Sequence, residues 1–494
     1  MDFVKNSDDP ALAERVWFSF AAWHLSKCDH DHALRVTTLT SVRRHHSVTR
    51  GEVTNMNQHP LHSRWQTHRH PVVVLTAVIV FLSIPSGAWG AAQEGPTRLE
   101  VSKRERLNQL EQAQIFIERE TSTLDLRKGP VDGLTFDPAA VVACEYQLPG
   151  ARLGGATPKF LCRVGGTVYK VKYLPSAKYG TTSKNGRSPD REIYAEMAAT
   201  RLFWALGFGA DRVFLTNVTC HGCPASPHDG PDEREQRTRA YRSSVRPIGI
   251  ALIEQRFEGA TIAAGGDEGW TWSELHEHVG RARASADPSS APSAFSSPSV
   301  REQAEALQLL QVFVQHGDCK PEQQRLVCVP GGAVRRTSGG AARSSTVGFS
   351  QDGDAEEEAG GQEYTCQSPF ALVDDLGATF GGAGSFTGSG AKMSLSNWAK
   401  KPVFDATSGG ACRGVLTPSM SCSGGMENPV ITEAGRQFLL NRLRQLSDAQ
   451  LHDLFAAARV TDFCDDAAEC SVDAWVAVFK DKVRQIATHS CAGR

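Results

Sequence analysis

Two aspartates stand at places in the chain where a carboxylate could do chemistry. Asp318 lies in the segment HGDCKPEQQRL, residues 316–326, between a predicted helix and a strand-like run. Asp375 follows the apolar run FALVD directly and is itself followed by Leu376 and Gly377. A carboxylate can accept the proton of an attacking hydroxyl, and it can bind magnesium. An aspartate can also simply cap a turn, so each residue taken alone leaves both interpretations open.

The two segments resemble, in the required order, the catalytic loop and the metal-binding DFG element of protein kinases. The kinase loop has an HRD sequence followed by a lysine, a proline and a metal-binding asparagine. The resemblance implies that Asp318 is the catalytic base, that Lys320 lies near the transferred phosphate, and that Gln323 replaces the asparagine. It also implies that Asp375 holds the magnesium that bridges the nucleotide phosphates. ATP and magnesium are therefore the expected cofactors.

Upstream, TVYKVKY resembles the kinase strand that supplies a nucleotide-clamping lysine. The pattern places Lys170 in that position, and Lys172, on the same side of the strand, is the alternative. The lysine needs a carboxylate partner on the following helix, EIYAEMAATRLFWALGF. Glu196 is favoured over Glu192, one turn earlier, because AEMAATRLFWALGF resembles the corresponding helix of the secretory-pathway kinases.

Two further segments resemble parts of a kinase nucleotide site. IALIEQRFEGA resembles the hinge, which implies that Glu254 to Phe257 form a linker whose backbone binds adenine. LPGARLGGATPKF has Gly150, Gly154 and Gly155 but not the GxGxxG spacing of the kinase phosphate loop. This segment predicts either a backbone cradle for phosphate or an ordinary turn.

Periodicity and capping patterns predict the elements that must position these residues. Strands are expected over residues 160–164, 167–173, 213–218, 248–256, 324–329 and 370–373, and helices over 188–207, 300–315, 432–446, 447–459 and 472–489. Strands first and then helices, with one helix among the early strands, is an α+β arrangement. With the kinase resemblance, it implies a two-lobed protein-kinase-like fold with Gly/Ser-rich insertions. The expected N-lobe is 141–260 and the C-lobe 261–494, with low-complexity insertions at 282–299 and 331–361, after a helical or linker segment at 93–140.

The run VVVLTAVIVFLSI, residues 72–84, is too short to span a membrane and is followed by small residues. It predicts a secretory signal peptide over residues 56–92, preceded by a disordered upstream extension over 1–55. The alternative is a signal anchor that is not cleaved. Either way the protein is expected to be exported, to the periplasm, the cell envelope or the medium, with membrane contact only through this segment.

Composition narrows the classes of partner. The formal net charge is −2 and the basic residues are dispersed, which excludes a nucleic-acid-binding surface. Of 13 cysteines, only Cys28 precedes the expected cleavage site, so an even number reaches an oxidising compartment and several disulfides are expected. Cys220 and Cys223 form a CxxC that predicts a structural disulfide ahead of a redox pair or half a zinc site.

The sequence also departs from the kinase pattern. Gln323 is one methylene longer than asparagine, and the segment after Gly377 lacks an APE-like motif. Export also places the protein where ATP is scarce. Two functions therefore stay open: an exported atypical kinase acting on an unknown hydroxyl-bearing substrate, or a catalytically inactive kinase-like protein of the cell envelope that binds a protein partner or other ligand.

Overall fold

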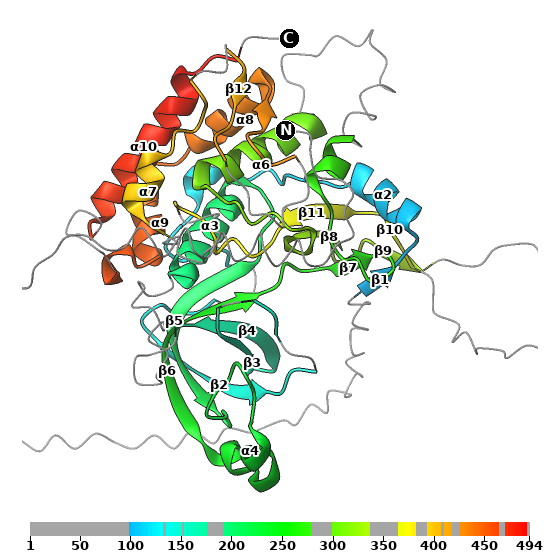
Figure 1. Cartoon of the computed structure of the whole chain (residues 1–494), viewed down its shortest axis with the longest axis vertical. Coiled ribbons are helices and arrows are strands. Elements are labelled where there is room, and N and C mark those ends of the chain that lie inside the picture. The colour runs from blue at the N-terminus through cyan, green and yellow to red at the C-terminus, as the bar shows by residue number, and fades with distance from the viewer. Residues whose placement is uncertain are drawn as a thin grey trace, which may run out of the picture. The chain divides into compact units, whose positions relative to one another are not determined.

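The computed structural model describes residues 98–131, 135–150, 153–155, 157–174, 191–277, 299–335, 364–381, 393–406, 410–416, 425–463 and 470–491 (Figure 1). The predicted upstream extension and signal peptide lie outside these residues, as do most of the two low-complexity insertions. Among the described helices, none is long and apolar enough to cross a membrane.

Five strands close into a barrel in the order β2-β3-β4-β6-β5 (Figure 1). They are β2 (Val141–Gln147), β3 (Lys159–Val164), β4 (Thr167–Tyr173), β5 (Arg212–His221) and β6 (Val245–Gln255). Neighbouring strands are antiparallel except β2 and β5, which run parallel. Side chains alternate along a strand, so Tyr169 and Val171 of β4 fill the barrel core while Lys170 and Lys172 lie on its outer face.

The β3–β4 hairpin is formed as the sequence predicts. Val164 pairs with Thr167 across Gly165 and Gly166, whose φ angles of 57° and 91° are those a two-residue type I′ turn requires. The turn fixes the register of the hairpin. Lys159 at the start of β3 consequently lies opposite Lys172.

Helix α3 (Glu192–Leu206) follows the hairpin and packs against β5. Every residue of α3 except Trp204 is buried, because the helix is covered by the barrel on one side and by C-terminal helices on others. It ends at Gly207, which adopts the left-handed conformation common after helices. The predicted helix is thus present from residue 192, and the first residues predicted for it lie outside the described part of the chain.

A second sheet has the strand order β1-β7-β8-β11, formed by β1 (Arg98–Glu100), β7 (Ala260–Ala263), β8 (Gln324–Cys328) and β11 (Pro369–Val373). The predicted antiparallel pairing of β8 with β11 is confirmed. Helix α6 (Val300–Val314) precedes this hairpin and begins with a capping box between Ser299 and Glu302. Residues 315–323 connect α6 to β8, and Asp375 follows β11, so the hairpin positions both candidate acidic segments.

The remaining elements are α2 (Lys103–Glu111), α4 (Glu233–Thr238), β9 (Ala333–Arg335), β10 (Tyr364–Cys366), α7 (Leu395–Lys400), β12 (Cys412–Arg413), β13 (Val430–Ile431), α8 (Glu433–Leu443), α9 (Asp448–Ala457) and α10 (Val472–Thr488), with short 3₁₀ turns between some of them. The capping box predicted at the start of α9 is present. The mixture of a barrel, a small sheet and C-terminal helices confirms the α+β class.

Disulfides join several segments of the described chain. One links β2 to β3, one closes the CxxC, one links β8 to β10, and one ties β12 to the C-terminal segment: Cys144–Cys162, Cys220–Cys223, Cys328–Cys366 and Cys412–Cys491. The expectation of several disulfides is confirmed. The CxxC forms a disulfide, as its preferred interpretation requires.

Candidate active site

The ammonium of Lys172 is the centre of a buried ionic cluster. On β4 it faces Lys159 of β3 and Leu252 of β6, so it has no acidic residue directly opposite it. Its Nζ instead donates to both carboxylate oxygens of Glu196 on α3, at 2.8 and 2.7 Å, and to Oδ1 of Asp375 at 2.8 Å. The side chain of Lys172 is 0% exposed. Strand β4, helix α3 and the end of β11 therefore meet at one cation.

The expected ion pair between Lys170 and Glu196 is wrong, and the alternative lysine, Lys172, makes it. Lys170 is paired with Glu254, its direct partner across the β4–β6 ladder. A carboxylate opposite on the neighbouring strand captures Lys170, whereas Lys172 has none there and reaches the helix. Glu192, the alternative acid, lies 4.0 Å from Lys172 Nζ and is the more distant of the two helix carboxylates.

The charges of the cluster follow from burial and from its one central cation. Burial alone would lower the pKa of Lys172, but the carboxylates of Glu196, Asp375 and Glu254 outweigh it and raise that pKa well above its usual value. Burial opposes ionisation of Asp375, yet Lys172 lowers the pKa of Asp375 well below its usual range. Burial raises the pKa of Glu196, and Lys172 offsets this only in part. Lys172 and Asp375 are consequently both charged at neutral pH.

The two adjacent aspartates after β11 point to different partners. Asp374 accepts a hydrogen bond from the backbone N–H of Asp375 and lies 3.9 Å from Arg325. Asp375 has a φ of 50°, a left-handed conformation that costs a non-glycine residue about 1–3 kcal/mol and that occurs disproportionately at functional sites. This conformation directs Asp375, rather than Asp374, to the lysine. Gly377 is required nearby, because a Cβ there would overlap with the Cγ of Glu192.

The segment between α6 and β8 brings Asp318, Lys320 and Gln323 next to Asp375. The 3₁₀ turn Pro321–Gln323 directs the Gln323 amide back toward the aspartates. Its Nε2 donates to Asp318 Oδ2 at 2.9 Å and lies 3.4 Å from Asp375 Oδ2. Lys320 Nζ is 3.4 Å from Asp318 Oδ2. The Asp318 side chain is 24% exposed, so it is partly open to solvent.

The oxygens of this cluster suit a magnesium ion. Asp375 uses Oδ1 for Lys172, and its Oδ2 faces Gln323. The Gln323 amide oxygen is buried and has no hydrogen-bond partner within the described residues, so exchanging the amide oxygen and nitrogen would offer a ligand beside Asp375. The nearest carboxylate oxygens of Glu192, Glu196 and Asp375 also lie within 4.8 Å of one another. Asp375 and Gln323 are therefore residues of this cluster whose oxygens could act as ligands of a metal ion.

The predicted hinge differs from its expected form. Glu254 is the penultimate residue of β6 and is buried against Lys170, so its expected place in a linker is wrong. Phe257 does lie in the short link from β6 to β7. Its backbone N–H donates to Asp211 Oδ1 at 2.7 Å, and its ring stacks on Phe370 at 5.2 Å. That N–H is therefore already occupied and does not face a ligand.

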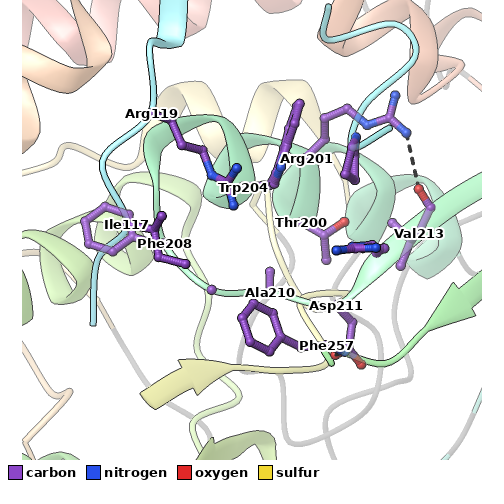
Figure 2. Close-up of a pocket in the computed structure, with 13 residues that line it drawn as sticks. Ile117, Arg119, Thr200, Arg201, Trp204, Phe208, Ala210, Asp211, Val213 and Phe257 are labelled. Carbon is purple, nitrogen blue, oxygen red and sulfur yellow. Dashed lines mark hydrogen bonds between the residues drawn. The ribbon is translucent and has the colours of Figure 1, made fainter. Parts of the chain in front are cut away.

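Figure 2 shows a small cavity beside Phe257, lined also by Thr200 and Trp204 of α3 and by the segment that leads into β5. Its volume is about 30 Å³. A cavity needs about 10–15 Å³ of such volume to hold one water molecule, so this one has room for about two. The cavity is too small for an adenine ring and is distinct from the cluster around Lys172.

One basic residue of this region was not found from the sequence. Lys159, opposite Lys172 on β3, is only 6% exposed. The sequence does contain the information that places Lys159 here. The two-residue turn at Gly165 and Gly166 fixes the register of the hairpin and hence the partner of each residue. Counting back from that turn pairs the two lysines.

No protein-family model matches the sequence, and no curated protein matches it. Among solved structures, the chain is similar to the crystal structure of a Helicobacter pylori proinflammatory kinase, CtkA, with a TM-score of 0.33 and 9% sequence identity. The match covers 71% of this chain and 97% of that chain. A similarity at this TM-score and identity is too weak to transfer a fold or an activity.

Proposed function

We propose that the chain is an exported, atypical kinase-like phosphotransferase, which transfers the γ-phosphate of ATP to a hydroxyl-bearing acceptor. The observation that carries the proposal is that a strand lysine, Lys172, forms ion pairs with both a helix glutamate, Glu196, and an aspartate after a strand, Asp375. The loop residues Asp318 and Gln323 lie against the same aspartate. The four segments come from distant parts of the chain and occur in the order that the kinase resemblance requires.

In this proposal the fold is the two-lobed fold of the protein kinases. The N-lobe, 141–260, contains the barrel and α3, and the C-lobe, 261–494, contains α6, the β8–β11 hairpin and the C-terminal helices. The boundary falls within β7, which belongs to the second sheet. The ion pair of Lys172 with Glu196 lies within the N-lobe, whereas the ion pair of Lys172 with Asp375 joins the N-lobe to the C-lobe.

The chemistry assigned to each residue follows from its position. Asp318 accepts the proton of the acceptor hydroxyl, and Lys320 beside it donates to the phosphoryl oxygens. Lys172 donates to the nucleotide phosphates and is held in place by Glu196. Asp375 and Gln323 would hold magnesium, which neutralises the charge of the phosphates when it is bound.

Export is part of the proposal and is supported by the disulfides. Disulfides persist in the extracytoplasmic compartments of most organisms, and those described here link strands of the barrel as well as the C-terminal segment. An uncleaved signal anchor agrees with them equally well. The N-terminal residue of the mature protein separates the two possibilities.

A catalytically inactive, kinase-like binding protein is the second candidate, and one observation favours it. The Gln323 amide donates to Asp318 and approaches Asp375, so the protein's own hydrogen bonds join the two carboxylates that catalysis needs. In this case the ionic cluster would stabilise a scaffold that binds a protein partner or another ligand. ATP turnover decides between the candidates.

The proposal is tested by the thermal stability of the mature protein with and without magnesium and ATP. A ligand that binds the folded state at 100 times its dissociation constant stabilises it by about 2.7 kcal/mol. We expect magnesium-ATP to raise the melting temperature of the wild type, and Asp375→Asn to abolish the increase. Asp473→Asn is the control, since that side chain on α10 is 81% exposed and distant from the cluster in sequence.

Turnover is tested with Asp318→Asn. This variant should keep the magnesium-ATP stabilisation and lose ATP turnover, because the amide cannot accept the hydroxyl proton. A wild type that gains no stability from millimolar magnesium-ATP contradicts the phosphotransferase. A wild type that binds ATP without turnover, equal to Asp318→Asn, favours the binding protein instead.

A further inference from the structure

Lys159 and Lys172 form a pair of like charges directly opposite each other on β3 and β4. Both are buried, with 6% and 0% of their surface exposed. Like charges at such a cross-strand position destabilise a sheet. Lys172 is compensated by carboxylates, whereas no carboxylate of the described residues lies within ion-pair distance of Lys159.

The ammonium of Lys159 lies against the glycine-containing segment that connects β2 to β3. A Cβ added to Gly155 would be 2.8 Å from Lys159 Nζ, and Gly155 has a φ of 94°, which favours glycine. The backbone N–H of Lys159 lies 3.3 Å from Nδ1 of His228 and is held there. The side chain thus extends along the turn and on the same strand face as Lys172.

A charged Lys159 side chain at this position destabilises the folded protein when no ligand is bound. Burial lowers the pKa of Lys159, and the neighbouring charge of Lys172 lowers it further. An apolar side chain of similar length would avoid the desolvation of an unpaired ammonium. A residue that only had to fill this space would not need a charge.

We infer that Lys159 binds phosphate oxygens of the nucleotide in the proposed site, together with Lys172. This inference rests on the proposed function and adds a residue that the kinase resemblance did not assign. An anion between the glycine turn and β4 would compensate Lys159 and remove its repulsion from Lys172. Under this inference, the segment that contains Gly155 would contribute to phosphate binding through the neighbouring Lys159 side chain rather than through a GxGxxG loop.

The test compares the mature wild type with Lys159→Met and Lys159→Arg, by calorimetric binding of magnesium-ATP and by melting temperature without ligand. A hydrogen bond to a charged group contributes enough that its loss weakens binding by about 10- to 100-fold. We expect this loss in Lys159→Met, with an unchanged or higher melting temperature, and at least partial recovery in Lys159→Arg. Lys482→Met is the matched control, because Lys482 is also buried, at 1% exposed, but lies on α10.

The possible results separate this inference from the proposed function. Wild type and Lys159→Met with equal affinity for magnesium-ATP overturn the inference and leave the phosphotransferase standing. Weaker binding with a lowered melting temperature and no recovery in Lys159→Arg shows a structural role and also overturns it. A wild type that does not bind magnesium-ATP removes the proposed function, and the inference with it.

Discussion

Replacing Lys172 by methionine tests the central ion pairs of the site. Methionine has a similar length and no charge, so the variant mainly removes one buried ammonium. Three hydrogen bonds are lost, two to Glu196 and one to Asp375, at 2.7 to 2.8 Å. The folded protein is then left with carboxylates that have lost their partner.

The size of the effect depends on how deeply each partner is buried. The side chains of Lys172 and Glu196 are 0% and 1% exposed, whereas that of Asp375 is 32% exposed and water can replace its partner in part. Removing one member of a buried ion pair typically costs about 3–5 kcal/mol, because the other charge is left unpaired. We therefore expect Lys172→Met to lose about 3–5 kcal/mol of unfolding free energy at pH 8. Folded domains have only about 5–15 kcal/mol in total.

The loss should depend on pH in a defined direction. Without Lys172, the pKa of Asp375 in the folded state rises above its unfolded value of about 3.8, and the pKa of Glu196, which burial already raises to about 8, rises further. A carboxylate whose folded pKa is raised contributes its stability at low pH and loses it as the pH increases through that pKa. The variant is therefore closest to the wild type near pH 5, where the carboxylates take up protons. A carboxyl pKa that is higher by one in the folded than in the unfolded protein corresponds to about 1.4 kcal/mol, which is reached only below the unfolded pKa, so the loss at pH 5 should be smaller than the loss at pH 8 by a fraction of that amount.

The assay is urea denaturation of the oxidised protein at pH 5 and pH 8. Lys480→Met is the control, because Lys480 donates to both oxygens of Asp448 at 2.9 and 2.8 Å but has a 51% exposed side chain. An exposed pair of this kind contributes only about 0–1 kcal/mol. A loss in Lys172→Met no larger than in Lys480→Met, or one of equal size at both pH values, would refute the reasoning.

Three further changes test neighbouring features. Burial raises the pKa of Glu196 to about 8, so the contribution of Glu196 to stability is full below pH 4.5 and is lost as the pH rises to about 8. In Glu196→Gln the urea midpoint should therefore fall less over this pH range than in the wild type. An equal fall in both proteins contradicts the assignment. Gly377→Ala places a Cβ against the first turn of α3, so it should lower the free energy of unfolding by about 1–3 kcal/mol and weaken the stabilisation by magnesium-ATP. A variant with the melting temperature of the wild type would show instead that the helix moves freely. The double variant Cys144→Ala/Cys162→Ala opens an 18-residue loop and should lose about 3 kcal/mol, seen as a lower urea midpoint. The reduced wild type, which lacks the other disulfides as well, should have a midpoint lower still, and a double variant with the wild-type midpoint would contradict this contribution.

The elements that carry the site could be predicted because their signals are local. The pair of glycines at 165 and 166 indicates a two-residue turn, and the capping box at Ser299 indicates where α6 begins. The alternation along β4 correctly placed Lys170 and Lys172 on one face. These features depend on residues within a few positions of each other, so one sequence contains them completely.

The choice between the two lysines could not be predicted, since it depends on the pairing of β4 with a distant strand. Lys170 is paired with Glu254 only because the β4–β6 register places them opposite, and 84 positions separate them along the chain. The position of Glu254 inside β6, rather than in a linker, also depends on this long-range pairing of strands. Closure of the barrel is likewise a long-range property, and a pattern of short strands alone does not specify which of them pair.

Removing each of the two buried lysines on this face, and comparing the stability and the magnesium-ATP binding of the two variants, tests the proposed site in a way that no single substitution does. Lys172 has short hydrogen bonds to two carboxylates, so its removal should destabilise the protein without ligand. Lys159 has a like charge opposite it and no carboxylate within ion-pair distance in the described chain, so its removal should leave that protein equally stable or more stable. Both removals should weaken magnesium-ATP binding. A cluster that served only to hold the fold together would lose stability in both variants, because each of its charges would then have to be stabilising.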